Sequence, residues 1–579
     1  MIAKSLNIIL DRPSGKYLTI AGLTLLSYSV FGYTYAGNPN VIQVLPFIRK
    51  IMDPALYPGD PYVDTLGSFP SLYPRLMAFL AQAVDLARLH LLLHIALKYL
   101  LLWTAYHLAE FLFARRATSW LACFLFALSP QVHLLSILGD EPMFKTALYQ
   151  TSMSGPFLLL GILWHLKERY RSAFALVAGL YYINPLTANF ILVLFAAAGF
   201  DHWRKAKWGW GVFVLLWLPW LLWYLSLKNP FGGPTNDFLT ALRLWDPSHY
   251  FPSAWPLEKW LRLSTMGALL GFFLAQGFAH CRKANNIKLF CRAMVIMWSC
   301  AFIFGEIFPV IPVIRLQLFR SDIFLVAFGL IFGADFLRRL AADARLQSLA
   351  AAGLIVVALV ELSPPYYGLM IMPILIARAW TRSRSLILGL TLSALAVILC
   401  DALGESPAVT KTLIALLLLT LFAFSVLAAE TKKYATAARA MILVFLIPCA
   451  LNARVIIHRI KFLDFDHKNT KQMDWDELQL WANNNAPPGA VFLTPPGAHG
   501  FRVLSLRSPY IEWIDGAAMH WAPGFEKEWL QRLAQADFMM TIGLSRVSDD
   551  IPIEAVIVEG RSEQPAIYEN ETFSVLKNY

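Results

Sequence analysis

Charged residues are scarce in this sequence. Asp, Glu, Lys and Arg together make up 15% of its 579 residues, against about 25% in a typical soluble domain. Hydrophobic residues make up 58%. This balance excludes a string of soluble domains. It predicts one large α-helical polytopic membrane protein with a smaller soluble part.

Cysteine pairs and nucleotide-binding motifs are also missing. The six cysteines lie in or beside apolar runs, and none forms a CxxC pair, so the sequence predicts neither a disulfide framework nor a zinc site. It contains no GxGxxG, Walker, GxSxG or HExxH motif. The net charge of +11 is scattered in twos and threes between apolar runs. That scatter suits membrane topology better than a nucleic-acid partner.

Apolar runs fill most of the first 457 residues. A membrane-spanning helix needs about 20 residues, and the runs predict about fifteen spans. Two pairs are short and are broken at Asn184-Pro185 and Pro364-Pro365; each is either two short helices or one kinked helix, so the count varies by two. The first run lacks a signal-peptide cleavage site and is expected to be retained. The runs begin near residues 17, 89, 118, 147, 172, 185, 207, 259, 289, 319, 347, 365, 385, 411 and 437.

Basic residues recur at every second connection between these runs. The positive-inside rule places such connections, and the N-terminus, in the cytoplasm. An odd number of spans then places the C-terminus outside. The basic groups are Arg115/Arg116, Lys167/Arg169/Arg171, Arg204/Lys205/Lys207, Arg282/Lys283, Arg338/Arg339, Arg382/Arg384 and Lys432/Lys433.

The segments expected on the outer side are longer and more polar. Within the outer loop 36–88, "NVIQVLPFIRKIM" and a stretch from Tyr73 have apolar residues at helical spacing, which predicts amphipathic helices lying on the membrane surface. Residues 458–579 are expected to form a small extracytoplasmic α/β domain. Its predicted helices are "MDWDELQLWANNN" and "GFEKEWLQRLA", and its predicted strands are "AVFLTPP", "FRVLSL", "SPYIEWI", "FMMTIG" and "AVIVEG".

Four acidic residues on the outer side directly precede proline: Asp53, Asp60, Glu141 and Asp246. One interpretation is structural, because Asp-Pro commonly begins a turn. On this interpretation Asp53, which directly follows an amphipathic stretch, simply ends that helix. The alternative is a site. Asp60 in "LYPGDPYVD" and the pair Asp140 and Glu141 in "LGDEPMFK" lie on neighbouring outer loops. Converging there, they would hold a general base, a divalent cation, or both.

Cationic and aromatic side chains on the same side suit a phosphate-bearing ligand. "VIRLQLFRSD" carries Arg315, Gln317 and Arg320, and arginine binds phosphate in a bidentate manner. "RLWDPSHYFP" adds Arg243, His249 and Tyr250 as substrate-binding candidates. The alternative is placement at the lipid headgroup level, which these residue types favour.

The C-terminal stretch "GAHGFRVLSLRSPYIEW" adds Arg502 and Arg507. These arginines either bind a sugar or an anion, or pair with Glu512 or Asp515. The sequence leaves both readings open.

Several stretches together resemble a known class of enzymes. The layout of a cytoplasmic N-terminus, a long first outer loop with an early Asp, an acidic second outer loop and an outer C-terminal domain is similar to that of the GT-C integral-membrane glycosyltransferases. The resemblance is closer to a group of uncharacterised bacterial membrane proteins related to that class. It is carried by "LPFIRKIMDPALYPGDPYV", "GLYYINPLTANF", "DPSHYFPSAW", "LQLFRSD" and "PPGAVFLTPPGAHGFRVLSLRSPYIEW".

The resemblance implies transfer of a sugar from a polyprenyl-phosphate carrier to a glycan or protein acceptor, on the outer face of a bacterial inner membrane. It makes Asp60 or Asp53 the catalytic base and matches Asp140 and Glu141 to the second-loop acids. Arg315 and Arg320 would hold the donor phosphate.

One departure bears on catalysis. Many GT-C enzymes carry an acid directly after the first span, where this chain has Asn38 and Asn40, and an amide is not a base. Either the base lies further along the loop or the protein does not catalyse transfer. The alternative function is a lipid-linked saccharide transporter or a non-catalytic partner in envelope polysaccharide synthesis. The paired helix breaks favour it, whereas ionisable residues at span ends and a long outer loop favour a transferase.

Overall fold

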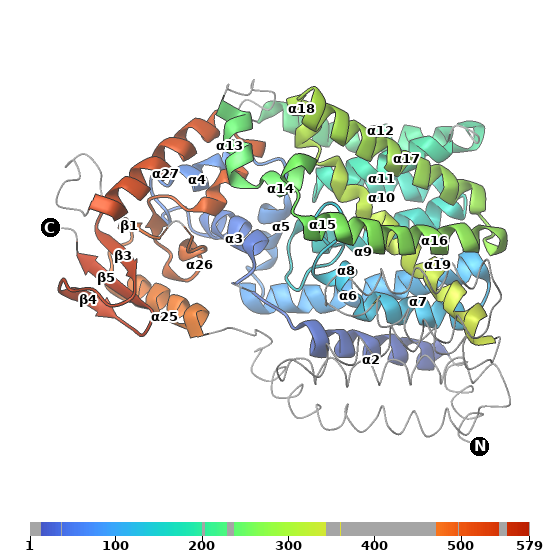
Figure 1. Ribbon diagram of the computed structural model, residues 1–579, viewed down its shortest axis with the longest axis horizontal. Helices are drawn as coiled ribbons and strands as arrows, with labels where there is room; N and C mark the ends of the chain where they lie inside the picture. Colours follow the sequence, from blue (N-terminus) through green and yellow to red (C-terminus); the bar gives the residue numbers. More distant parts are fainter. Residues whose placement is uncertain are drawn as a thin grey trace, which may run out of the picture.

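The computed structural model describes residues 13–35, 37–199, 203–227, 237–342, 359, 470–495, 497–542 and 553–577. It shows a bundle of helices with a mixed α/β domain at one end (Figure 1). The runs that begin near 347, 365, 385, 411 and 437 lie outside the described residues, as do the Pro364-Pro365 break and the domain boundary at 457/458.

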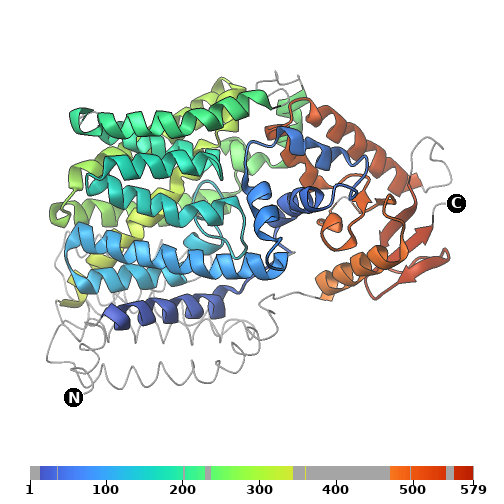
Figure 2. The same ribbon diagram turned by 180° about the vertical axis from the view of Figure 1, so that it is seen from behind.

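The long helices of the bundle lie side by side (Figures 1 and 2). In the described part of the chain, four helical stretches are long and apolar enough to cross a membrane: Leu86–Phe113, Arg204–Ser226, Leu257–His280 and Ala284–Ile307. These stretches are compatible with a membrane protein. The bundle helices are α2 (Pro13–Phe31), α6 (Leu86–Phe113), α7 (Arg116–Leu128), α8 (Pro130–His133), α9 (Gln150–Leu166), α10 (Tyr170–Tyr181), α11 (Pro185–Gly199), α12 (Trp203–Ser226), α15 (Leu257–Arg262), α16 (Ala268–Gly277), α17 (Ala284–Phe302), α18 (Ile311–Arg315) and α19 (Ile323–Ala342).

The break at Asn184-Pro185 separates two helices rather than kinking one. Helix α10 ends at Tyr181 and α11 begins at Pro185. Pro185 suits the first position of a helix because it has no N–H to leave unpaired. The Asn184 Oδ1 accepts a hydrogen bond from the Thr187 backbone N–H at 3.3 Å. The Asn184-Pro185 pair therefore accounts for both the end of α10 and the beginning of α11.

The loop 36–88, which the sequence predicts on the outer side, contributes helices α3 (Pro39–Met52), α4 (Pro61–Asp64) and α5 (Tyr73–Leu80). The apolar face predicted for α3 is present, since Val41, Leu45 and Ile48 are fully buried. That face has protein partners, α5 and α26 (Phe501–Ser505). Two further helices, α13 (Asp237–Trp245) and α14 (Pro247–Tyr250), lie at the same end of the bundle.

The C-terminal domain is a five-stranded mixed sheet with helices packed against it. The strand order is β2-β1-β3-β5-β4; β1 pairs in parallel with β2 and β3, whereas β5 pairs antiparallel with β3 and β4. The elements are α25 (Thr470–Asn485), α26, α27 (Phe525–Ile542), β1 (Val491–Leu493), β2 (Ser508–Pro509), β3 (Ala555–Glu559), β4 (Ala566–Glu569) and β5 (Phe573–Lys577). The predicted α/β character and both predicted helices are confirmed.

Two predicted strands are helical in the structure. "FRVLSL" forms α26, bounded by Gly500 at φ +82° and Leu506 at φ +54°; left-handed residues end regular structure on both sides. The first five residues of "FMMTIG" continue α27, where Trp529, Leu533 and Ala536 are buried at helical spacing, and the last one lies outside the described residues. Short apolar runs do not distinguish a strand from a buried helix face.

Candidate functional site

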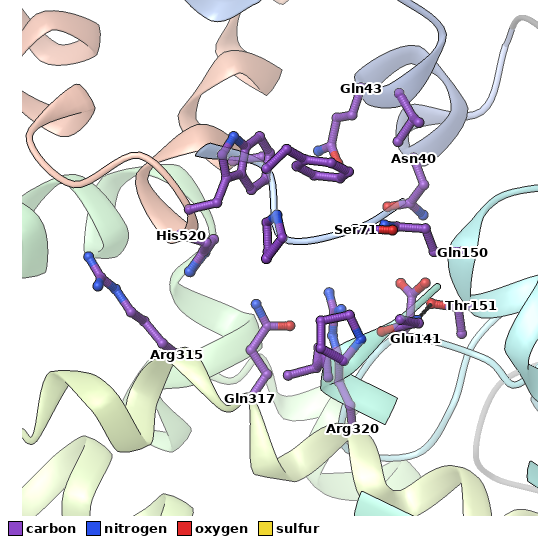
Figure 3. A pocket seen from close by; sticks show the side chains of 18 of the residues that line it. Asn40, Gln43, Ser71, Glu141, Gln150, Thr151, Arg315, Gln317, Arg320 and His520 are labelled. Atoms are coloured by element: carbon purple, nitrogen blue, oxygen red, sulfur yellow. Dashed lines mark hydrogen bonds between the residues drawn. The ribbon is translucent and has the colours of Figure 1, made fainter. Parts of the chain in front are cut away.

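A cavity of about 940 Å³ lies where the helix bundle meets the C-terminal domain. Its walls come from α3, the loop before α5, the second outer loop, the start of α11, the end of α12, the α13–α14 junction, the segment after α18 and the 3-10 helix Trp513–His520 (Figure 3). The size is within the range of ligand sites, about 300–1,000 Å³. Of the predicted site residues, Asp140, Glu141, His249, Arg315, Gln317 and Arg320 line it.

One side of the cavity is cationic. Arg315 ends α18, and its guanidinium lies 4.9 Å from the centre of the Phe238 ring. Its Nη2 donates a long 3.4 Å hydrogen bond to the Met519 carbonyl, while its buried Nε has no partner among the described residues. Burial lowers the pKa of Arg315. A guanidinium in this state would gain from an anionic ligand.

Arg320 is held by a neutral histidine. Its Nε donates to the Nε2 of His249 at 2.6 Å, so that nitrogen carries no proton. Burial, followed by the charge of Arg320, lowers the pKa of His249 well below its usual value. The other ring nitrogen, Nδ1, lies 3.8 Å from the Asp246 carboxylate. His249 is thus a positioning residue that aims Arg320.

A second chain of hydrogen bonds fixes Gln317. Its Nε2 donates to the Tyr250 hydroxyl at 2.9 Å, and that hydroxyl pairs with the His520 Nε2 at 2.7 Å. Burial lowers the pKa of His520 to about 3, so the ring is neutral; with Nε2 as acceptor its proton sits on Nδ1. In the described chain, the His520 Nδ1 and the Gln317 Oε1 are buried without partners. Both residues line the cavity.

The loop that carries Asp140 and Glu141 brings both acids to the same cavity. Gly139 lies directly against Arg320, and a Cβ there would come within 2.5 Å of the Arg320 Cα. The Asp322 Oδ2 ties the loop down by accepting from the N–H groups of Leu138 at 2.5 Å and Gly139 at 3.2 Å. The loop therefore adjoins the cationic segment, as the sequence predicts for two elements of one site.

Two non-glycine residues at this junction are strained. Asp140 has φ +52° and Gln317 has φ +49°, a region that non-glycine residues seldom occupy. Strained residues cluster at functional sites.

Both loop acids have cationic partners. Asp140 pairs with Lys259 and, at 3.1 Å, with Arg262. Glu141 pairs with Lys145 at 2.7 Å and accepts from the Tyr149 hydroxyl. A third cavity acid, Asp246, has only a 3.3 Å hydrogen bond from Ser248 and the distant His249 ring in the described chain. Burial raises the pKa of Asp246.

The structure does not bring Asp60 or Asp53 to the cavity. Asp60 caps α4, where its Oδ1 accepts from the N–H groups of Tyr62 and Val63, and its side chain is fully buried against Arg502. Asp53 is exposed at the end of α3 and accepts from the Ala55 N–H at 2.9 Å. The expected convergence of Asp60 with Asp140 and Glu141 is therefore absent. Each of these three carboxylates instead has a cation beside it.

Arg502 is the centre of a buried ionic cluster. It binds Asp60 (2.7 and 3.1 Å), Asp515 (2.8 and 3.0 Å) and Glu512 (3.0 Å). The sequence left open whether the C-terminal arginines bind a sugar or an anion, or pair with Glu512 or Asp515. Arg502 pairs with both of these acids. Arg507 donates instead to backbone carbonyls, including those of Asn483 and Ala486. The cluster joins the loop 36–88 to the C-terminal domain.

The cluster makes stability depend on pH. Burial, with the nearby carboxylates of Asp515 and Asp60, raises the pKa of Glu512 to about 8. Between about pH 4.5 and 8 the folded protein then holds a proton that the unfolded chain releases, so the free energy of unfolding falls as pH rises, by at most about 1.4 kcal/mol per pH unit for one proton. We expect Glu512→Gln to flatten this slope in denaturant titrations at several pH values. The exposed control Glu571→Gln should keep the wild-type slope; equal slopes in all three proteins would contradict the assignment.

Other candidates lie apart from the cavity. Arg243 is exposed on α13, with its guanidinium 4.2 Å from the centre of the Phe251 ring. Tyr250 acts through Gln317 and is absent from the cavity wall. Within the described ranges, no group of three or more His, Cys, Asp or Glu side chains is placed to hold a metal ion. The carboxylates suggested as ligands of a divalent cation do not fit one because cationic side chains already neutralise them.

Several lining residues escaped the sequence reasoning. His520 and Trp513 belong to the C-terminal domain, whereas Gln43 lies in the first half of α3 and Gln150 is the first residue of α9. Asp246 was visible as an acid before proline. The others carry no local pattern, because the chain brings them together only through tertiary contacts.

Comparison with known proteins covers the C-terminal domain. Residues 473–536 match a family model described as a domain of unknown function, DUF6798. The matched segment contains most of α25, all of α26 and most of α27. It therefore includes Arg502, Glu512, Asp515 and the cavity residue His520. No curated protein matches the chain.

Proposed function

We propose that the protein is a multi-pass membrane glycosyltransferase of GT-C type, which transfers a sugar from a polyprenyl-phosphate carrier to a glycan or protein acceptor. The observation that carries the proposal is one cavity that combines unpaired arginine and histidine donors with carboxylates at the end of an apolar bundle. A lipid carrier would keep its chain among the helices and present its phosphate at their ends.

Arg315, Arg320 and the His520 Nδ1–H are the proposed phosphate-binding groups, and Gln317 accepts a ligand hydroxyl. These groups are held in place before a ligand arrives, which lowers the cost of ordering them. Donors aimed at a departing phosphate also stabilise the charge that develops as the sugar–phosphate bond breaks.

Asp246 is the proposed base in place of Asp60 or Asp53. It takes the acceptor's hydroxyl proton while the acceptor oxygen forms a bond to the sugar's anomeric carbon and the carrier phosphate leaves with the bonding electrons. The pKa of Asp246 is raised, and Asp246 forms no ion pair with a Lys or Arg side chain among the described residues, although the charges of Arg320 and Lys259 act on it. This state suits a base better than the paired states of Asp140 and Glu141. Glu141 then positions Lys145.

One observation favours a lipid-linked saccharide transporter instead. The break between α10 and α11 opens onto the cavity, where Asn184 and Pro185 are lining residues, and transporters commonly bind substrates at interrupted helices. The strained acidic loop and the outer domain over the cavity suit a transferase better.

We further propose about fifteen spans in a bacterial inner membrane, with the N-terminus cytoplasmic and the C-terminal domain outside. The basic connections support this orientation. It places the cavity on the non-cytoplasmic face.

Binding of the bare carrier tests the phosphate assignment without knowledge of the sugar. Arg315→Lys and Arg320→Lys keep the charge but lose the planar fork of donors, and we expect each to weaken binding of a polyprenyl phosphate about tenfold or more, measured by native mass spectrometry of the full chain in nanodiscs. The control Arg243→Lys, exposed and outside the cavity, should bind like wild type. Wild-type affinity in both cavity variants would remove the basis of the proposal.

A further inference from the structure

Helix α6 carries a stripe of ionisable side chains inside the bundle. His90, His94 and Lys98 follow one another at intervals of four residues, so they share one face of the helix. All three are fully buried, and none of them lines the cavity. Helix α6 is also one of the stretches long and apolar enough to cross a membrane. Ionisable side chains inside such helices are rare and commonly mark a pathway for protons or ions.

Lys98 is the basic end of this stripe and is held without an acid. Its Nζ donates to the Ser27 Oγ at 3.2 Å and lies 4.2 Å from the centre of the Tyr28 ring. Within the described ranges, no carboxylate forms an ion pair with it. A hydroxyl group and an aromatic ring of α2 therefore take the place that a counter-ion usually has beside a buried charge.

His133 lies on the other side of the Ser27 hydroxyl. Its Nε2 is 3.4 Å from the Ser27 Oγ and 2.9 Å from the Phe126 carbonyl oxygen, and its Nδ1 is 3.0 Å from the Phe144 carbonyl oxygen. A carbonyl only accepts, and a neutral imidazole has one N–H. Only an imidazolium satisfies both carbonyls at once. Phe126 belongs to the last turn of α7, where the free carbonyls of a helix favour a cation.

Two charges on either side of one hydroxyl would repel each other. We propose that Lys98 and His133 share a single proton through the Ser27 hydroxyl, and that this proton site acts on the loop that carries Glu141. The proposal goes beyond sugar transfer and does not depend on it.

The transfer of this proton needs no other reactant. In the first state the Lys98 ammonium donates to the Ser27 Oγ, and the Ser27 hydroxyl donates to the His133 Nε2. A Lys98 N–H bond then breaks, its electron pair stays on the nitrogen, and the proton forms a new O–H bond at Ser27. The original Ser27 O–H bond breaks, and its proton forms the Nε2–H bond of His133. Ser27 ends as a neutral hydroxyl, and the positive charge has moved from α6 to the end of α7.

The loop between α8 and α9 receives the effect of the transfer. The His133 Nδ1–H donates to the Phe144 carbonyl in both states, whereas the Nε2–H that forms on transfer donates to the Phe126 carbonyl. The imidazolium thus ties the loop to α7 through one ring. Lys145 follows Phe144 directly and pairs with Glu141 in the cavity wall. The position of the proton therefore sets how firmly this part of the wall is held.

The other titratable groups beside the site have separate roles. The Tyr28 hydroxyl pairs with the His94 Nδ1, and the His94 Nε2–H donates to the Lys145 carbonyl at 2.8 Å. With Tyr28 as the donor, His94 is a neutral ring whose proton is on Nε2. The Lys145 ammonium pairs with Glu141. His90 lies one turn nearer the start of α6, and its ring nitrogens are buried without partners in the described chain. These contacts leave the shared proton to the other two groups.

Solid-state ¹⁵N NMR of the full chain in lipid bilayers, with labelled histidine and lysine, reads the protonation of both groups. We expect averaged resonances whose positions give an ammonium fraction of Lys98 and an imidazolium fraction of His133 that together equal one at neutral pH. In Lys98→Met, loss of the neighbouring cation should raise the midpoint of the His133 titration by about one pH unit or more. The control Lys288→Met, exposed on α17, should leave that midpoint unchanged.

Two results would overturn the proposal. One is a wild-type protein in which both groups are charged, or both neutral, at neutral pH. The other is a His133 midpoint that Lys98→Met leaves in place. If Lys98→Met does not fold, Ser27→Ala decides, because it keeps both ends and removes the bridge. It should give separate resonances for the two forms of His133, and an averaged resonance there would reject the transfer. None of these measurements uses a carrier or a sugar.

Discussion

Replacing Arg502 with Leu is expected to destabilise the folded protein by about 3–5 kcal/mol. The substitution removes the guanidinium that compensates Asp60, Glu512 and Asp515, all of which are buried. These three acidic side chains, of which Glu512 keeps a proton below about pH 8, would then face one another without a counter-ion. The loss should appear as a lower midpoint in denaturant unfolding, and as faster proteolysis where the outer loop meets the C-terminal domain.

A matched control lies in the same domain. Arg532 is partly exposed and pairs with Glu528 at 3.1 Å one helical turn away, and exposed pairs of this kind contribute about 0–1 kcal/mol. Arg532→Leu should therefore cost clearly less than Arg502→Leu, although it also removes a 3.2 Å hydrogen bond to the Tyr510 carbonyl. If Arg502→Leu costs no more than Arg532→Leu, the cluster does not hold the two parts together.

Asp246→Asn is expected to reduce transfer by about a hundredfold or more, because it keeps the side chain's size and removes the proposed base. Binding of polyprenyl phosphate should be unchanged, since Asp246 does not belong to the proposed phosphate-binding groups. The measurement is release of polyprenyl phosphate from a sugar-loaded carrier in the presence of acceptor.

The control for this prediction is Asp237→Asn, an exposed acid at the start of α13. It should retain full turnover. Asp60→Asn gives a further contrast: it should lower stability but leave turnover of the folded fraction intact. Full activity in Asp246→Asn would reject this residue as the base.

Local patterns in the sequence predicted the features that local physics determines. Apolar runs indicated the helices of the bundle, and the Asn-Pro pair at 184–185 indicated a break. The basic "VIRLQLFRSD" and the acidic "LGDEPMFK" were recognised as site segments, and the structure places Arg320 directly against Gly139. Charged residues and prolines are distributed unevenly between the segments. This uneven distribution identifies the helix break and the charged segments without any knowledge of the fold.

Asp60 shows why contacts between distant parts of the chain could not be predicted from the sequence. Its partner Arg502 lies 442 positions away in the sequence, and no spacing rule connects them. The same local features that suggested a restrained base, a proline on its C-terminal side and an early position in the loop, also suit a helix cap beside a distant arginine. His520 and Gln150 entered the cavity wall by the same kind of long-range contact.

The Arg502 cluster also has a consequence for the order of events during biosynthesis. A ribosome produces Asp60 hundreds of residues before Arg502, so the aspartate has to remain hydrated while the helices are inserted. Domains generally fold in the order in which they emerge, and contacts between distant residues form late because closing a long loop costs entropy. The 3-10 helix Trp513–His520, which forms one wall of the cavity, is synthesised after Arg502. The cavity is therefore completed by the last part of the chain, and translation itself delays the site until the bundle beneath it exists.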